Sequence, residues 1–387
     1  MDEPIVYGSP VDEGALAQIT DCLNGGAEYV CLMADHHQGY KMPIGGVCAY
    51  KNKVTVEGVG FDIACGNKAV RLNGVKSNDL NVPLLMDDIY SSLSFGVGLK
   101  NKEAVDHEVF YLDAWKLPQI ANLKDLAREQ LGTIGSSNHY VDVFADEHDN
   151  VWVGVHFGSR GFGHKTATAF LELAGAKDSI SGAPVLLDTN ESLGAEYIEC
   201  MQLAGLYAYA GRDWVCQKVA SIIGAPIVEE VHNHHNFAWK ETHFGEEYWV
   251  VRKGATPAFP GQKGFVGGSM GDNSVIIEGI DSENARNILH STVHGAGRVM
   301  SRTQAAGKMN YKTRTRSGGL ITREMMMDWL KPLGVELRGA GTDESPQAYK
   351  RLDEVLGFHS DSIKVLHTLR PLGVCMASAN EVDPYKD

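Results

Sequence analysis

Thr133-Ile-Gly-Ser-Ser-Asn-His-Tyr-Val-Asp-Val-Phe144 and Val151-Trp-Val-Gly-Val-His-Phe157 are two stretches separated by a short polar turn, Glu147-His-Asp-Asn150. The first moves from a Gly/Ser loop into alternating apolar residues, and the second is a similar apolar run, so the pair predicts a β-hairpin. Antiparallel pairing would bring His139, at the start of the first strand, beside His156, at the end of the second. The predicted hairpin therefore also predicts that His139 and His156 lie close together.

Helix and strand patterns alternate irregularly on both sides of this hairpin. Helical spacing of apolar residues is clearest in Val11–Cys22 and in a long segment from Ser192 to Ile223. Further helical segments are expected within 80–130 and at 158–174, 353–357 and 361–365, and strands at 28–33, 47–50, 54–56, 69–73, 228–235, 248–252, 264–266 and 274–277, with a polar loop at 34–46. We find no repeat, low-complexity tract or clean linker. The pattern favours a mixed α/β (α+β) fold with residues 1–387 in a single large domain.

Composition narrows the classes of function. Of the 387 residues, 43% are hydrophobic, and Asp and Glu outnumber Lys and Arg by 49 to 35, which gives a net charge of -14. This balance argues against broad electrostatic adhesion to nucleic acid or to an anionic membrane, so a phosphate-rich partner would need a local basic patch. No apolar run approaches a membrane span, the start is unlike a signal peptide, and the seven cysteines are scattered without a C-x-x-C pair. We therefore expect a cytoplasmic protein with free thiols.

Asp62-x-x-Cys65 places a carboxylate and a thiol three residues apart on a turn flanked by glycines. Both side chains can face one ion, although this motif taken alone is more often an Asp turn with a buried cysteine. His139 and His156, joined by the expected hairpin, add two imidazoles. Separated segments that supply Asp, Cys and His are what a site for one or two metal ions requires, with the thiolate able to bridge.

A third source of imidazoles is Val231-His-Asn-His-His-Asn236. Alternation along a strand turns His234 and His235 to opposite faces, so His232, His234 and His235 do not all point to one site. Ligand softness would favour zinc for a Cys/His site, and manganese binds most weakly in the divalent series. The type of ligand would therefore name the wrong metal if cellular supply decides.

His294 directly precedes a Gly-Ala-Gly turn that ends in Arg298. Exposed backbone N-H groups and a guanidinium are the surroundings that an incoming polyphosphate needs, so His294 is a candidate nucleophile towards phosphorus. A histidine before such a turn also serves as a capping or packing residue. The other site residues decide between these interpretations.

The chain resembles the RtcB family of RNA-splicing ligases over nearly its whole length. The matching stretches are Gly58-Val-Gly-Phe-Asp-Ile-Ala-Cys-Gly66, Leu131-Gly-Thr-Ile-Gly-Ser-Ser-Asn-His139, His156-Phe-Gly-Ser-Arg-Gly161, His234-His-Asn236, His243-Phe-Gly-Glu-Glu247, Arg252-Lys-Gly-Ala255, Gly268-Ser-Met-Gly271, His294-Gly-Ala-Gly-Arg298, Met300-Ser-Arg302, Ala348-Tyr-Lys350 and Thr368-Leu-Arg370. Each is short, and their number and order carry the resemblance.

The resemblance implies an RtcB-like domain with several β-sheets flanked by helices around a central metal cleft. It implies two manganese ions that share Cys65, with Asp62, His139, His156 and His235 as the other ligands. It also implies that GTP guanylylates His294, that GMP passes to an RNA 3′-phosphate, and that a 5′-hydroxyl then displaces GMP. Ends with a 2′,3′-cyclic phosphate are opened first. The expected role is RNA repair or tRNA splicing, by a monomer or weak homodimer.

Further residues are candidates for contacts with nucleotide and RNA. The resemblance places the guanylate among Asn138, Asp142, Ser269, Gly295, Ala296, Gly297, Arg298 and Tyr349. For RNA, Lys308-Met-Asn-Tyr-Lys-Thr-Arg-Thr-Arg316 interleaves basic and aromatic residues, which also describes a solvated charged loop. Arg160, Arg298 and Arg302 are better placed to meet terminal phosphates.

The chain departs from the family pattern at several positions. Met376 stands where a lysine usually contacts the guanylate, and the nearest lysine of the tail is Lys386. Asp142 replaces a usual glutamate. Smaller changes are Ala64, Asn67 and Gly267. Two alternatives to ligation follow: a metal-dependent phosphoesterase that acts on RNA ends, and a metal- and RNA-binding paralogue that has lost ligation.

Overall fold

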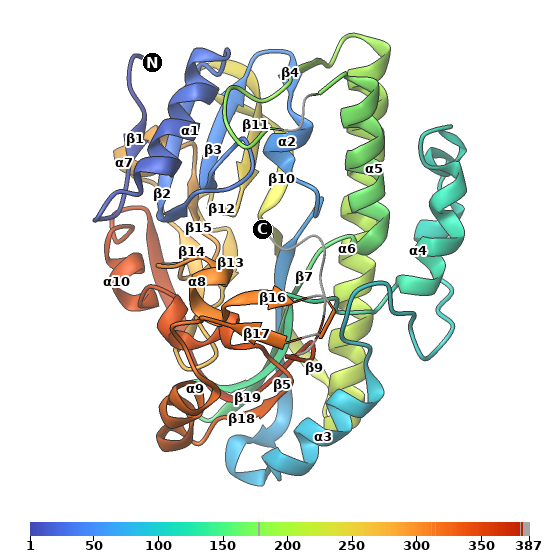
Figure 1. The fold of residues 1–387 in the computed structure, drawn as a ribbon, viewed down its shortest axis with the longest axis vertical. Helices are drawn as coiled ribbons and strands as arrows, with labels where there is room; N and C mark the ends of the chain where they lie inside the picture. Colours follow the sequence, from blue (N-terminus) through green and yellow to red (C-terminus); the bar gives the residue numbers. More distant parts are fainter. Residues whose placement is uncertain (177–178, 311, 314, 380, 382–387) are drawn as a thin grey trace.

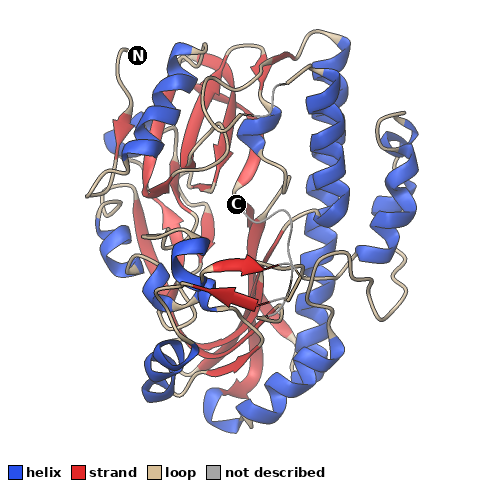
Figure 2. Ribbon diagram, in the orientation of Figure 1, coloured by secondary structure: helices blue, strands red, loops and turns tan. Residues whose placement is uncertain are grey.

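A computed structural model describes residues 1–176, 179–310, 312–313, 315–379 and 381. Its framework is two β-sheets with helices packed along them (Figure 1, Figure 2). The first has the order β1-β2-β3-β11-β10, with bounds β1 Ile5–Val6, β2 Tyr29–His37, β3 Ile44–Tyr50, β11 Glu246–Lys253 and β10 Asn236–His243. This mixture of sheets and helices confirms the expected α/β fold class.

The second sheet carries the predicted hairpin at its centre. Its order is β13-β14-β19-β6-β7-β5-β9, with β18 paired to β19, and its bounds are β13 Lys263–Val266, β14 Ser274–Gly279, β19 Ile363–Met376, β6 Tyr140–Ala145, β7 Asn150–Phe157, β5 Gly66–Lys76, β9 Ile227–His234 and β18 Glu336–Arg338. Strands β6 and β7 are antiparallel, with Tyr140 opposite His156. The hairpin and the pairing that it implied are confirmed.

Short elements complete the fold. Within the described residues, three strand pairs stand apart: β12 Ala255–Pro257 with β15 Ser291–Val293, β16 Lys308–Asn310 with β17 Thr315–Ser317, and β4 Lys53–Val54 with β8 Leu187–Asp188. The α-helices are α1 Glu13–Asn24, α2 Val56–Val59, α3 Val82–Ser92, α4 Lys124–Gln130, α5 Arg160–Leu173, α6 Ser192–Ile223, α7 Glu283–Asn287, α8 Arg302–Ala306, α9 Arg323–Leu330 and α10 Leu352–Gly357. Short 3-10 helices lie at Ser77–Asp79, Glu108–Tyr111, Asp113–Lys116, Ala121–Leu123, Lys331–Leu333, Thr342–Glu344 and Pro346–Ala348. Among the described residues, no helix is long and apolar enough to cross a membrane.

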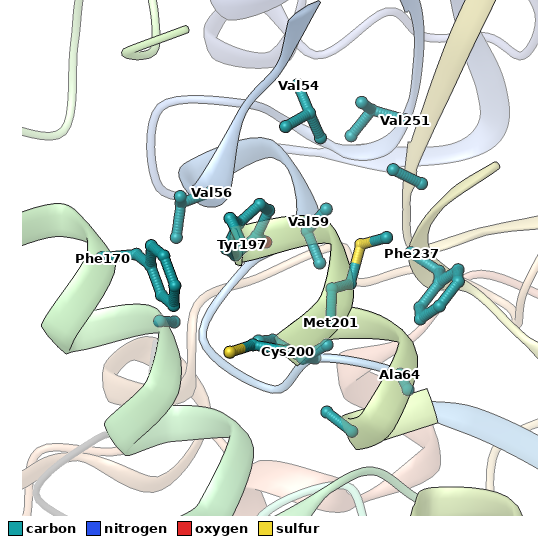
Figure 3. Close-up of a cluster of buried hydrophobic side chains, with 14 of the residues drawn as sticks. Val54, Val56, Val59, Ala64, Phe170, Tyr197, Cys200, Met201, Phe237 and Val251 are labelled. Atoms are coloured by element: carbon teal, nitrogen blue, oxygen red, sulfur yellow. The ribbon is translucent and has the colours of Figure 1, made fainter. Parts of the chain in front are cut away.

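Helix α6 joins the two sheets. Its first half, including Tyr197 and Met201, is buried in a hydrophobic cluster with residues of β3, β10, β11 and α5 (Figure 3). Its second half, including Val215 and Val219, is buried in another cluster beneath β5, β6 and β7. The helix therefore passes from one core to the other, and the residues between these halves lie where the sheets meet.

Three local expectations are wrong. Residues 361–365 do not form a helix, because β19 begins at Ile363 and pairs with β14 and then with β6. Partner strands distant in the sequence supply these hydrogen bonds, and no local pattern reports them. Residues 34–46 are not all loop, since β2 continues to His37. Val56 belongs to α2 rather than to a strand, because Thr55 caps that helix by accepting a hydrogen bond from the Gly58 N-H group.

Candidate metal centre and active site

Five side chains from four segments converge where the sheets meet. Asp62 and Cys65 lie on the turn between α2 and β5, and a core contact secures this turn, since Ala64 packs in the cluster of Figure 3. His139 directly precedes β6 and His156 is near the end of β7, so the hairpin brings their rings to a centroid distance of 5.4 Å. His235 lies between β9 and β10. All five predicted metal ligands are therefore brought together.

Their donor atoms form two groups that share one thiol. Cys65, His156 and His235 form one group, and Asp62, Cys65 and His139 form the other, with the donor atoms of each group within 4.8 Å of one another. The Cys65 Sγ atom lies 3.2 Å from His156 Nε2 and 3.5 Å from His139 Nε2. Two donor groups that share one sulfur fit the pair of metal ions, bridged by Cys65, that the family resemblance implies.

Backbone carbonyls orient two of the imidazoles. The Ile134 carbonyl is 3.1 Å from His139 Nδ1, and the Asn138 carbonyl is 3.1 Å from His156 Nδ1. For His156, an Nδ1-H group that donates to the Asn138 carbonyl leaves the Nε2 lone pair facing the cluster, which is the tautomer that a metal ligand needs. His139 Nδ1 lies between the Ile134 carbonyl and the Arg160 guanidinium. Loop 134–138 therefore supports both histidines through its main chain.

Burial controls the charges of this cluster. Burial alone would raise the pKa of Asp62, but the His139 imidazole and the Arg160 guanidinium outweigh it and lower that pKa to about 2. Burial, followed by the charge of Asp62, raises the pKa of the Cys65 thiol well above its usual value. Burial also lowers the pKa of His156 and His235, and neighbouring imidazoles lower it further. These pKa shifts favour the charged form of Asp62 and the neutral forms of Cys65, His156 and His235.

These residues fit a pair of divalent cations. Among the described residues, the buried Asp62 Oδ2 atom has no partner in hydrogen-bond geometry, and His139 Nε2 lies 3.0 Å away. The His235 Nδ1 atom likewise has no hydrogen-bond partner in the part of the chain that the structure describes. A buried carboxylate oxygen without a donor is costly in an apoprotein, and coordination to a cation would satisfy it.

His294 lies beside this cluster and is held by a buried carboxylate. It follows β15, and its ring centroid is 4.8 Å from that of His235. The His294 Nδ1-H group donates to Asp35 Oδ2 over 2.7 Å, and the backbone N-H groups of His294 and Gly295 donate to the same oxygen over 3.1 and 3.4 Å. With Nδ1 engaged, the lone pair of Nε2 lies on the opposite side of the ring and is available as a nucleophile.

Asp35 was missed in the sequence because it falls in the stretch interpreted as a loop. It lies near the end of β2 and is fully buried. Burial would raise the pKa of Asp35, but contact with His294 lowers it below the usual value. The available signal in the sequence was the position of the Asp35 carboxylate, between the buried strand residues before it and the glycine-rich loop after it. Nothing in the sequence linked it to a residue 259 positions away.

The turn after His294 contacts the predicted nucleotide loop that carries Ser269 and the backbone of Asp35. Gly295 forms a β-bridge with Gly267, which brings the loop with Ser269 alongside the turn. Gly297 has a φ of 77° and packs so closely against the Asp35 backbone that a Cβ atom there would lie 2.2 Å from the carbonyl oxygen. Only glycine fits this position.

Arg298 closes the turn against Tyr349. Its guanidinium donates to the Tyr349 hydroxyl over 3.0 Å and lies 4.9 Å from the centroid of that ring. It also donates to the backbone carbonyls of Met300 and Asp343. The predicted residues Gly295, Ala296, Gly297, Arg298 and Tyr349 therefore form one contiguous wall.

The other candidate arginines differ in their surroundings. Arg160, at the start of α5, brings its guanidinium to 3.1 Å from His139 Nδ1, so it lies at the donor cluster. Arg302 forms ion pairs with Asp343 and Glu344, which largely neutralise its charge. Arg160 is thus the better placed of the two for a phosphate next to the cluster.

The basic and aromatic stretch forms the hairpin of β16 and β17. Lys308 and Lys312 are exposed on it, while Tyr311 and Arg314 lie outside the described residues. The Arg316 guanidinium donates to the Gly307 carbonyl. Exposed lysines suit both a contact with RNA and a solvated loop, so both interpretations of this stretch stay open.

Asp142 and Met376 lie on neighbouring strands behind the cluster. Met376 pairs with Tyr140 and is buried in a hydrophobic cluster with it, and Val374 pairs with Asp142. Asp142 is buried, its Oδ1 atom has no hydrogen-bond partner among the described residues, and burial raises its pKa well above the usual value. A lysine at position 376 would place a positive charge near the Asp142 carboxyl, whereas the Met376 thioether is uncharged. Lys386 lies outside the described residues.

Comparison with known proteins identifies the family of the chain. The model of the family described as tRNA-splicing ligase RtcB matches residues 16–116 and 112–377. Two Escherichia coli proteins, RNA-splicing ligase RtcB1 and RNA-splicing ligase RtcB, are each 31% identical to the chain, and each alignment covers 90% of this chain and 90% of the relative. The tRNA-splicing ligase RtcB of Archaeoglobus fulgidus is 31% identical, over 89% of this chain and 86% of its own.

The fold, the paired donor groups and these similarities define an enzyme of the ligase class. The chain belongs to the tRNA-splicing ligase RtcB family.

Proposed function

We propose that this protein is a GTP- and manganese-dependent RNA ligase that joins an RNA 3′-phosphate or 2′,3′-cyclic phosphate to a 5′-hydroxyl end. The observation that carries the proposal is the position of His294, whose Nδ1-H group donates to Asp35 while its ring packs against His235 of the donor cluster. A carboxylate-supported imidazole beside a site for two cations is suited to nucleophilic attack on phosphorus.

The proposed reaction begins on His294. Its Nε2 lone pair attacks the α-phosphorus of GTP, a P-N bond forms, the bond to the bridging oxygen breaks, and pyrophosphate leaves. Asp35 keeps the proton on Nδ1 and stabilises the positive charge that develops on the ring. Divalent cations held by Asp62, Cys65, His139, His156 and His235 would neutralise phosphate oxygens during these steps.

Transfer and sealing follow. An oxygen of the RNA 3′-phosphate attacks the guanylate phosphorus, the P-N bond breaks, and His294 is restored. The 5′-hydroxyl oxygen then attacks the RNA phosphorus, GMP leaves, and the hydroxyl proton passes to solvent. A 2′,3′-cyclic phosphate first takes up water to give a 3′-phosphate. Arg160 lies where it can neutralise a phosphate next to the cluster.

The wall beside His294 is the proposed nucleotide site. Gly295, Ala296, Gly297, Arg298 and Tyr349 would line the guanylate with Ser269, Asn138 would contact a phosphate, and Asp142 would lie deeper, towards the base. The seven cysteines are buried free thiols, which suits work in a reducing cytoplasm. We propose that the enzyme acts there in RNA repair or tRNA splicing, as a monomer or weak homodimer.

Labelling with GTP tests the proposal. The protein is incubated with Mn²⁺ and GTP labelled at the α-phosphorus, and the acid-labile covalent adduct is measured. We expect an adduct in the wild type and in His148→Ala, a change of an exposed histidine in the hairpin turn, and none in His294→Ala. A wild type without adduct would overturn ligation.

Met376 favours a second candidate, because it removes a charge from the nucleotide site. If no adduct forms but Mn²⁺-dependent release of phosphate from RNA 3′ ends is found, the protein is a phosphoesterase of RNA ends. If it binds Mn²⁺ and RNA without changing either end, it is a binding paralogue that has lost ligation.

A further inference from the structure

Arg212 is a fully buried arginine at the midpoint of the molecule. It lies on α6 between the half that packs in the first core and the half that packs in the second. Burial lowers its pKa, and its hydrogen bonds to described residues all go to neutral acceptors, which are two backbone carbonyls and two imidazoles. A buried guanidinium is costly, so its hydrogen bonds must be close to complete.

The two carbonyls belong to neighbours of predicted metal ligands. One Arg212 amino group donates to the Ala64 carbonyl over 3.0 Å and to the Phe157 carbonyl over 2.6 Å. Ala64 directly precedes Cys65, and Phe157 directly follows His156. Arg212 therefore joins the turn before β5 to the end of β7.

The imidazoles extend this link to a third segment. The Arg212 Nε-H group donates to His232 Nε2, and its second amino group donates to His234 Nδ1, both over 2.8 Å. His234 directly precedes His235 and stacks on Tyr209 of α6 with ring centroids 3.9 Å apart. Within this motif, His232 and His234 accept hydrogen bonds from Arg212, and His235 faces the donor cluster.

We infer that Arg212 is a positioning residue of the metal centre, which holds Cys65, His156 and His235 in register through the residues next to them. Three segments distant in the sequence meet on one planar group with donors in several directions. The donors of a lysine all lie on one nitrogen atom, so a lysine cannot reach all of these acceptors at once. The inference rests on the metal centre of the proposed function.

Close packing gives a second reason for the arrangement. At Gly66, which directly follows Cys65, a Cβ atom would lie 2.3 Å from the Asn233 carbonyl oxygen and 3.1 Å from the Arg212 guanidinium. The absence of a side chain at Gly66 therefore lets Arg212 and β9 approach the Cys65 turn together. Small displacements of Arg212 would be transmitted directly to the ligand-bearing turn.

Metal binding without GTP or RNA tests the inference. Mn²⁺ affinity and stoichiometry are measured for the full-length wild type, Arg212→Lys and Arg212→Met, and Co²⁺ is used as a spectroscopic probe for its thiolate charge-transfer band. We expect Arg212→Met to weaken Mn²⁺ binding about 10- to 100-fold and to alter the Co²⁺ band. The Mn²⁺ affinity of Arg212→Lys should lie between those of the wild type and Arg212→Met, or equal that of Arg212→Met. The matched control is Arg252→Met, which removes another fully buried arginine that donates hydrogen bonds to Glu241, Ser291 and the Leu289 carbonyl.

The control separates positioning from general destabilisation. Loss of affinity in the Arg212 variants but not in Arg252→Met supports the inference. Unchanged affinity and band in a folded Arg212→Met, or an equal loss in both, overturns it. If Arg212→Met does not fold, His234→Asn and His234→Ala are compared instead. His234→Asn keeps a hydrogen-bond acceptor near the Nδ1 position, and His234→Ala does not. Tighter Mn²⁺ binding by His234→Asn than by His234→Ala supports the inference, and equal binding by the two variants overturns it. A wild type that binds neither ion refutes the metal centre itself.

Discussion

The His294 Nδ1-H group donates to Asp35 Oδ2 over 2.7 Å, and Asp35 is fully buried at the end of β2. The same oxygen accepts two backbone N-H groups of the turn, so one carboxylate fixes both the ring and its main chain. This relationship sets the tautomer and direction of the proposed nucleophile.

Changes at Asp35 should therefore slow guanylylation of His294. Asp35→Ala removes both the orientation and the charge, and we expect a decrease on the order of 10²- to 10⁴-fold in the rate of adduct formation. Asp35→Asn keeps an acceptor but removes the charge, so its rate should fall between Asp35→Ala and the wild type. Rapid-quench labelling with GTP measures these rates, and a wild-type rate in Asp35→Ala would contradict the assigned role.

The two donor groups predict different metal stoichiometries. Cys65 belongs to both groups, whereas Asp62 and His235 each belong to one. Cys65→Ala should lose tight binding of both ions, while Asp62→Ala and His235→Ala should each retain about one. Elemental analysis of dialysed protein counts the ions. Retention of two ions by Cys65→Ala would refute the shared ligand.

Asp142 should make folding stability fall as pH rises. Its folded-state pKa is raised, so the folded protein keeps a proton that the unfolded chain loses above a pKa of about 3.9. The stability from this group is present at lower pH and is lost as pH rises towards the folded pKa, by up to about 1.4 kcal/mol per unit. Asp142→Asn removes this dependence. Urea unfolding between about pH 5 and pH 8 should show the wild type weakening relative to the variant as pH rises, and parallel curves would exclude the effect.

Met376→Lys should increase the yield of the GTP adduct. Met376 is a diagonal neighbour of Asp142 across β19 and β6, within reach of a long side chain, so the introduced ammonium would pair with the buried carboxyl and face the nucleotide site. Adduct yield at limiting GTP measures the gain, and Met376→Leu is the matched control. The gain should diminish when Asp142→Asn is added. An unchanged yield in Met376→Lys would mean that the missing charge does not limit activation.

Much of the framework follows from local patterns. The hairpin of β6 and β7, α6 and the opposite faces of His234 and His235 were all predictable, because strand alternation and helical periodicity are short-range properties. The long strand β19 was not, and its Pro371 is tolerated at a register shift that only the paired strand reveals. Strand pairing between distant segments leaves no fixed spacing in the sequence.

The sequence by itself determined the family resemblance, the five donor residues and the candidate nucleophile, because these are matters of residue type and order. Only the tertiary structure decided that Asp35 supports His294 and that Arg212 joins the segments carrying Cys65, His156 and His235. Both are single side chains whose partners are distant in sequence, and their charges are tolerated only because folding buries them among fitting donors and acceptors.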